Sequence, residues 1–192
     1  VATADAGGLE YPTLVYQRST SPNVAHETAH QWFYALIGND QARDPWLDEG
    51  LATWAEARVD DDLDMYLRRP LPLDVRGKLG EPMEYWDRRL DTYYEGVYVQ
   101  GAQALGAVGP ADVVDCALRL YVSSNAFAVA DTADLWVDAA QLGLGHHDLA
   151  RAARRVFSLS RQILASTGVD PAILDLVAVY DERWISQGRS PA

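Results

Sequence analysis

The stretch His26-Glu27-Thr28-Ala29-His30 follows the pattern H-E-x-x-H and is the most informative part of the sequence. Two histidines four positions apart lie on one face of a helix, so both rings can reach a single zinc ion. Glu27 stands between them, where a carboxylate can act on water at the metal's open position. The pattern predicts metal-assisted hydrolysis, with the two histidines as ligands and Glu27 as general base. The alternative is a pair of surface or capping histidines on an amphipathic helix.

A catalytic zinc ion needs a third protein ligand, and Glu49 is the candidate for it. Eighteen residues separate His30 from Glu49, which lets one helix end, a turn form, and a second helix return antiparallel past the metal. The alternative for Glu49 is a first-turn carboxylate that the helix dipole favours. Because Glu49 follows an H-E-x-x-H pattern at this spacing, its role as a metal ligand is favoured. Glu56 and Asp48 are candidates to orient a ligand imidazole, with solvated surface charge as an equal alternative for both.

Hydrolysis of a peptide by metal-activated water also calls for a donor to the developing oxyanion, which H-E-x-x-H does not supply. Tyr93, Tyr94 and Tyr98 cluster on one predicted helix, and any of them could donate. Their spacing alone favours an aromatic core stripe. The other histidines, His146 and His147, follow a glycine-rich stretch and are expected to be exposed cap residues. Cys116, the single cysteine, is expected to be an inert core thiol.

The elements that must position these residues are mostly helical. Residues 9–17 suggest an edge strand, because they mix Tyr, Thr, Val and Leu with one proline. Ser21-Pro22 and Asp44-Pro45 each read as a helix start, and Gly38-Asn39 as a helix stop. Residues 60–62, all aspartate, are expected to be a solvated helix boundary, and 70–82 a loop. The predicted helices run from Pro22 to about Ile37, over 46–59, 83–107, 110–122, 132–143, 147–165 and 171–187.

The bulk composition fits one globular domain. The chain has 192 residues, of which 48% are hydrophobic and 23% charged, with a formal net charge of −12. That acidic balance argues against a nucleic-acid or anionic-membrane surface, which needs clustered Lys and Arg. No apolar run approaches the ~18 residues of a membrane span. The chain opens on Val1, and we expect it to be a trimmed or processed piece.

Residues 7–102 resemble the gluzincin aminopeptidases, the family of aminopeptidase N and leukotriene hydrolase. The metal motif continues as Gln31-Trp32-Phe33, and Glu49 lies within Trp-Leu-Asp-Glu-Gly, as is typical of the family. Gly7-Gly8-Leu9-Glu10-Tyr11 is similar to the family's Gly-x-Met-Glu-Asn, with Leu and Tyr replacing Met and Asn. Tyr98-Val99-Gln100-Gly101-Ala102 is similar to Tyr-x-Lys-Gly-Ala, with Gln replacing Lys. The likeness extends more weakly to about residue 140.

This resemblance implies a mainly α, thermolysin-like zincin catalytic domain over residues 1–192, with a small β portion near the N-terminus. It implies one Zn²⁺ per chain, and a Tyr98 that stabilises the tetrahedral intermediate with Tyr93 assisting. It further implies that Gly7 and Gly8 bind substrate backbone and that Glu10 holds the substrate's free amino group. In the family a β-rich domain precedes this segment, so we expect one in the full-length protein.

The sequence therefore predicts a zinc peptidase acting on a peptide substrate, most simply an aminopeptidase that removes N-terminal residues. Two alternatives stay open at this point. One is a zinc endopeptidase or related amide hydrolase, which would keep the chemistry without the requirement for a free amino group. The other is a non-catalytic zinc-binding interaction domain. The sequence leaves the compartment open.

Overall fold

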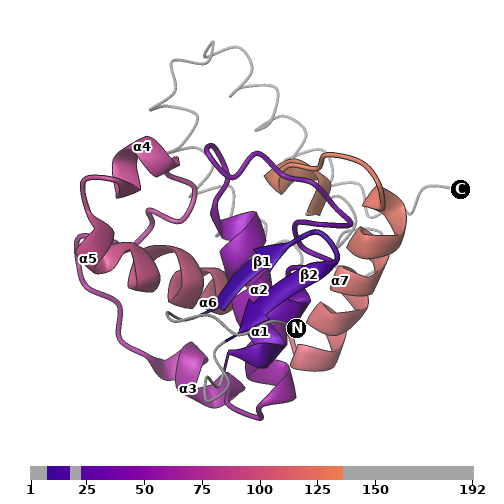
Figure 1. The fold of residues 1–192 in the computed structure, drawn as a ribbon. Coiled ribbons are helices and arrows are strands. Elements are labelled where there is room, and N and C mark those ends of the chain that lie inside the picture. Colours follow the sequence, from indigo (N-terminus) through magenta and orange to yellow (C-terminus); the bar gives the residue numbers. More distant parts are fainter. Residues whose placement is uncertain (1–7, 18–22, 136–192) are drawn as a thin grey trace, which may run out of the picture. The chain divides into compact units, whose positions relative to one another are not determined.

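The computed structural model describes residues 8–17 and 23–135. Within these residues the chain is mostly helical, with one small two-stranded sheet (Figure 1). The elements, in chain order, are β1 (Gly8–Tyr11), β2 (Leu14–Gln17), α1 (Val24–Ala29), α2 (Trp46–Val59), α3 (Leu63–Arg68), α4 (Met83–Trp86), α5 (Leu90–Tyr93), the π-helix η1 (Tyr94–Val99), α6 (Gln100–Gly106) and α7 (Ala111–Asn125). A mainly α fold with a small β portion is therefore observed.

The predicted single strand over 9–17 is instead a β-hairpin. β1 and β2 pair antiparallel, with Glu10 opposite Val15, and a two-residue turn joins them. The turn residue Thr13 has φ 67°, in the left-handed region that β-branched residues rarely adopt. Its backbone N–H donates to Gln31 Oε1 at 2.8 Å, while Gln31 Nε2 donates to the carbonyl of Tyr11 at 3.0 Å. Gln31 thereby fixes the hairpin against the segment that follows α1.

The helix predicted to run to Ile37 is regular only as α1, which ends at Ala29. From there to residue 37 the chain continues in irregular turns. The backbone N–H of Trp32 bonds three residues back, to Ala29, whereas those of Ala35 and Ile37 bond five residues back, to His30 and Trp32. Because these bonds alternate between tight and wide turns, no regular α-helix forms over 30–37. The expected start at Ser21-Pro22 lies outside the described residues.

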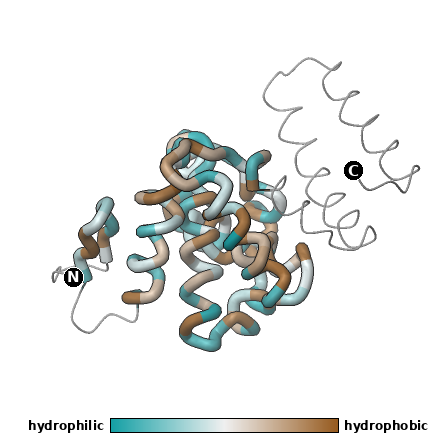
Figure 2. Tube along the Cα trace, turned by 90° about the vertical axis from the view of Figure 1, so that its right-hand side faces the viewer, coloured by the Kyte–Doolittle hydropathy of each residue, from teal (hydrophilic) through white to brown (hydrophobic). Residues whose placement is uncertain are grey.

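Helix α2 is the centre of the core, and its prediction over 46–59 is confirmed. It contacts α1, α3, η1 and α6, so most of its surface faces other helices and not solvent. Trp46, Leu47, Leu51 and Trp54 are all buried along it. Hydrophobic burial of this kind is the main stabilising contribution to a helical domain. In Figure 2 apolar and polar residues alternate along the described helices, as expected for helices with one buried side.

The single helix predicted over 83–107 is divided into α4, α5, η1 and α6. The break falls after Trp86, at Arg89, whose backbone is not helical (φ −145°, ψ 40°). The Trp86 indole is fully buried and packs on Gly96, where a Cβ atom would overlap the ring. Burying this indole requires the chain to turn back on itself between α4 and η1, and that tertiary contact overrides the helical propensity of the segment.

Helix α7 confirms the helix predicted over 110–122, although it begins and ends slightly later. Its buried face carries Val114, Ala117, Leu118 and Tyr121, at the spacing of an amphipathic helix. Cys116 lies on the opposite side and is exposed. The prediction of a core thiol was therefore wrong, because the face that is buried is set by the neighbours of α7.

Residues 132–135 begin the helix predicted over 132–143, and the rest of that helix lies outside the described residues. The same is true of the helices predicted over 147–165 and 171–187 and of His146 and His147. Among the described residues, no helix is long and apolar enough to cross a membrane.

Candidate active site

The structure brings His26, His30 and Glu49 together. His26 lies in α1 and His30 caps its C-terminal end, so the two rings share one face, with centroids 4.8 Å apart. Glu49 enters from the first turn of α2, which packs against α1. Its Oε2 atom lies 3.2 Å from His26 Nε2 and 3.5 Å from His30 Nε2. Both imidazoles are buried, and three possible ligand atoms converge on one point.

The outer nitrogen of each imidazole is held by a second carboxylate. His26 Nδ1 lies 3.2 Å from Glu56 Oε2, and His30 Nδ1 lies 2.6 Å from Asp48 Oδ1. An acceptor at Nδ1 fixes the ring orientation and leaves Nε2 free to bind an electrophile. Asp48 and Glu56, both on α2, therefore contact the histidines and do not project into solvent. The Asp48 carboxylate also accepts a hydrogen bond from the Gln41 side chain, a residue that no sequence motif singled out.

Electrostatics in this cluster favour positive charge. Burial lowers the pKa of His26, but the hydrogen bonds with Glu49 and Glu56 outweigh it and raise that pKa to about 10. Burial acts in the same sense on His30, and its bond to Asp48 raises the pKa on balance. Burial would raise the pKa of Glu49, yet the two histidines lower it overall. The carboxylates thus stabilise a cation at the point where the Nε2 atoms converge.

The donor set fits a zinc ion. Two imidazole nitrogens and one carboxylate oxygen are a ligand set of catalytic zinc sites, which keep a further position open. With metal–ligand bonds of about 2.0–2.2 Å in tetrahedral geometry, ligand atoms stand about 3.3–3.6 Å apart. The separations of 3.2 and 3.5 Å between Glu49 and the two rings are close to this spacing.

Glu27 lies beside the cluster with one oxygen unpaired. Its side chain is buried, and Oε2 has no hydrogen-bond partner within the described part of the chain. A buried carboxylate oxygen without a partner is costly, so such an atom marks a place where a further group binds. One oxygen each of Glu10 and Glu27 and a nitrogen of His30 lie within 4.8 Å of one another. Strand β1 passes so close that a Cβ atom on Gly8 would overlap the Glu27 carboxylate.

Helix η1 gathers the three tyrosines. In a π-helix each turn bonds residues five apart, so Tyr93 and Tyr98 come to lie on the same side. Their ring centroids are 5.6 Å apart, and those of Tyr94 and Tyr98 are 5.2 Å apart. The Tyr98 ring stacks on His26 with their centroids 5.6 Å apart, and its hydroxyl interacts with the Glu49 carboxylate. Burial, with the Glu49 charge, holds the pKa of Tyr98 well above its usual range, so the phenol stays protonated.

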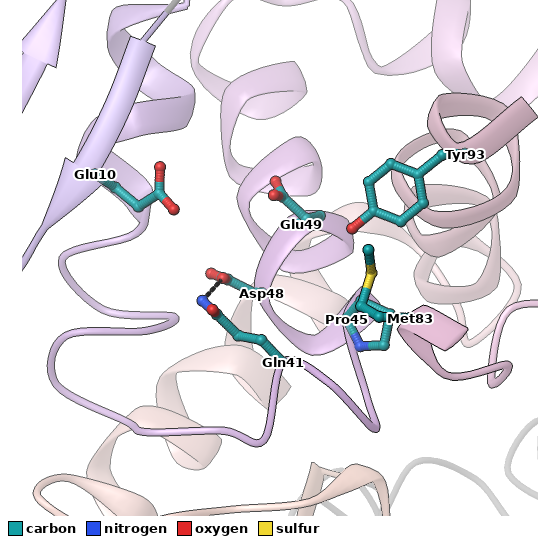
Figure 3. Close-up of a pocket in the computed structure, with 7 residues that line it drawn as sticks. All are labelled: Glu10, Gln41, Pro45, Asp48, Glu49, Met83 and Tyr93. Carbon is teal, nitrogen blue, oxygen red and sulfur yellow. Dashed lines mark hydrogen bonds between the residues drawn. The ribbon is translucent and has the colours of Figure 1, made fainter. Parts of the chain in front are cut away.

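A cavity of about 180 Å³ opens beside Glu49 (Figure 3). Figure 3 shows Glu10 reaching in from β1 and the Tyr93 ring facing Glu49 from the other side. The cavity is lined by Glu10, Gln41, Pro45, Asp48, Glu49, Met83 and Tyr93. Gln41, Pro45 and Met83 were not anticipated, because they lie in turns or at a helix start. Gly7, the other expected substrate-binding glycine, lies outside the described residues.

Comparison with known proteins gives one consistent result. Residues 10–79 match the peptidase family M1 domain. The chain is 30% identical over 130 residues to Aminopeptidase M1 of Arabidopsis thaliana, covering 59% of this chain and 15% of that protein. It is 34% identical over 65 residues to Leukotriene A-4 hydrolase of Xenopus laevis, covering 30% of this chain and 11% of that one.

Among solved structures, the M1 zinc metallopeptidase from Deinococcus radiodurans has the same fold. The TM-score is 0.54 at 22% identity, covering 78% of this chain and 36% of that one. The chain thus spans only a small part of the relatives it matches in sequence. The M1 domain match covers Glu10, His26, His30 and Glu49, and together with the sequence relatives it confirms the resemblance of this chain to the gluzincin metallo-aminopeptidases.

Proposed function

We propose that this chain is the catalytic domain of a zinc peptidase, in which His26, His30 and Glu49 hold one Zn²⁺. The observation that carries the proposal is the convergence of the two Nε2 atoms on Glu49 Oε2, with both Nδ1 atoms held by carboxylates. Zn²⁺ in such a site supplies Lewis acidity toward a peptide carbonyl and lowers the pKa of water. A β-rich domain preceding this one in the full-length protein is part of the proposal.

Glu27 is the general base. Its unpaired Oε2 is the atom that accepts the proton of the attacking water and passes it to the leaving amine. Burial raises the pKa of Glu27, which makes the carboxylate a stronger proton acceptor than an exposed glutamate. Tyr98 donates its hydroxyl proton in a hydrogen bond to the oxyanion that develops on the substrate carbonyl. Because its phenol stays protonated, it can donate throughout the working pH range.

Glu10 binds the free amino group of the substrate, which makes the enzyme an aminopeptidase. The Glu10 carboxylate lies close to Glu27 and also lines the cavity. Its neighbours in β1, Leu9 and Tyr11, are exposed and point to the opposite face of the strand. A substrate ammonium bound there would stand beside the peptide bond that Glu27 and Tyr98 serve. A charge-assisted contact discriminates strongly, because a blocked terminus leaves the carboxylate unpaired.

This specificity is tested with matched free and N-acetylated peptides. The wild type is expected to cleave only the free peptide, and Glu10→Ala to raise KM for it by roughly 10- to 100-fold, the loss of one hydrogen bond to a charged group. Steady-state kinetics measures both. Glu84→Ala is the control, since the same change is made at an exposed side chain. Equal cleavage of both peptides would reject the aminopeptidase in favour of an endopeptidase.

Asp48 is expected to support the metal through His30. Asp48→Ala removes the acceptor at His30 Nδ1 and should weaken zinc binding by about 10- to 100-fold. Asp48→Asn keeps an oxygen but loses the charge, so its zinc affinity should lie between those of the wild type and Asp48→Ala. Zinc affinity is measured by competition with a chelator.

The matched control for Asp48 is Asp60→Ala, at an exposed position after α2. It should bind zinc as the wild type does. Wild-type zinc affinity in Asp48→Ala would show that the Asp48–His30 contact does not act on the metal.

A further inference from the structure

Helices α2 and α6 touch through their backbones at two glycines, Gly50 and Gly101. A Cβ atom on Gly101 would stand 2.7 Å from Gly50 Cα. A Cβ atom on Gly50 would stand 3.0 Å from Gly101 Cα and 3.5 Å from the carbonyl oxygen of Val97. Both glycines are buried. Because the atoms in the way belong to the backbone, any side chain at this crossing would push the helices apart.

This crossing lies next to two residues of the site. Gly50 directly follows Glu49 in α2, and Gly101 lies one turn after Tyr98 along η1 and α6. Tyr98 stacks on His26 and its hydroxyl interacts with Glu49, so its position depends on how closely α6 approaches α2. His26, His30 and Glu49 all belong to α1, its C-terminal end or α2, and none to α6. We therefore expect a separation of α6 from α2 to shift Tyr98 relative to His26, His30 and Glu49.

We infer that Gly101 is a positioning residue that sets the place of the Tyr98 hydroxyl, and we rest this on the proposed function. The absence of a side chain at position 101 lets the phenol reach the edge of the site at which Glu49 lies. A displacement of about 1 Å at a catalytic group is enough to cost up to 10²-fold in rate. Gly101 thus acts on the transition state through Tyr98, and not on the metal.

The test is a double-mutant cycle with Gly101→Ala and Tyr98→Phe in the zinc-loaded chain. Tyr98→Phe is expected to lower kcat by about 10²–10³-fold, as removal of one oxyanion donor does. Gly101→Ala is expected to lower kcat by about 10- to 100-fold, with KM and zinc content unchanged. In the Tyr98→Phe background, Gly101→Ala should have little further effect.

Gly106→Ala is the matched control. It makes the same substitution in the same helix, where the three atoms nearest to the added Cβ all belong to the flexible side chain of Leu67. Its kcat should equal that of the wild type. A rate loss in Gly106→Ala as large as in Gly101→Ala would overturn the inference, because general damage to α6 would then suffice. The inference would also be overturned if Gly101→Ala lowered kcat in the Tyr98→Phe background as much as it does in the wild type.

Two readouts do not depend on turnover. The affinity of a phosphonate dipeptide, which mimics the tetrahedral intermediate, should fall in Gly101→Ala and in Tyr98→Phe, and not further in the double variant. A crystal structure of Gly101→Ala should place the Tyr98 hydroxyl away from Glu49, with His26, His30 and Glu49 unmoved. An unmoved hydroxyl would overturn the inference. If the wild type bound zinc but neither cleaved peptides nor bound the phosphonate, the proposed function would be rejected. The positioning of Tyr98 by Gly101 would still be tested by the crystal structure.

Discussion

Glu27→Gln is expected to retain zinc and fold while losing about 10²–10⁴-fold in kcat, the usual contribution of a general base. Glutamine keeps the size and one oxygen of the side chain but does not accept a proton from water. Glu27 is not one of the three proposed ligands, and its Oε2 has no hydrogen-bond partner among the described residues. Hydrolysis of an unblocked aminoacyl-amide, with zinc measured on the same sample, separates catalysis from metal binding.

The control for this substitution is Glu84→Gln, the same chemical change at a side chain that is 86% exposed. It should leave both kcat and zinc content at wild-type values. Near-normal turnover of Glu27→Gln at full zinc occupancy would contradict its role as base. A wild type that holds zinc but hydrolyses nothing would instead favour the non-catalytic zinc-binding domain.

His26→Ala is expected to abolish stoichiometric zinc binding. The change removes one of the three proposed ligands, and it also leaves the carboxylates of Glu49 and Glu56 without the imidazole that contacts both. Two carboxylates without that partner repel each other, so the remaining ligands no longer converge as they do in the wild type. Metal analysis after dialysis against a weak chelator measures the occupancy, and circular dichroism checks that the helices remain.

The control for His26→Ala is His146→Ala, a histidine outside the described residues that is not expected to bind metal. It should keep one zinc per chain. Unchanged zinc content in His26→Ala would reject the proposed ligand set, and loss of zinc in His146→Ala would point to a different one.

The local part of this site followed from sequence spacing alone. His26 and His30 share a face because they are four residues apart, and that geometry holds in a single helical turn regardless of what surrounds it. The start of α2 and the place of Glu49 in its first turn could also be predicted locally, because Asp44-Pro45 marks a helix start. The helix start and stop signals along the chain, with the strand-forming residues over 9–17, also sufficed to predict a mostly helical chain with a small β portion.

Features that depend on distant parts of the chain required the tertiary structure. The predicted helix over 83–107 is divided, because the Trp86 indole packs on Gly96 ten residues later. The π-turn in η1 brings Tyr93 and Tyr98 to one side, which α-helical spacing would not do. Cys116 is exposed because neighbouring helices bury the other face of α7. In each case long-range packing outweighed the local preference, because burying a large side chain contributes more free energy than the helix propensity of a few residues.

The same division applies to the partners of the site residues. The sequence predicts Asp48 and Glu56 as partners of the histidines and equally as solvated surface charges; the packing of α1 against α2 decides for the contacts with His30 and His26. Gln41, the closeness of Gly8 to Glu27, and the Gly50–Gly101 crossing carried no signal of their own. Residue types and short spacings determined which groups could do the chemistry. Which of them meet was decided by the packing of helices, since contacts between segments far apart in the chain depend on the whole core and not on local spacing.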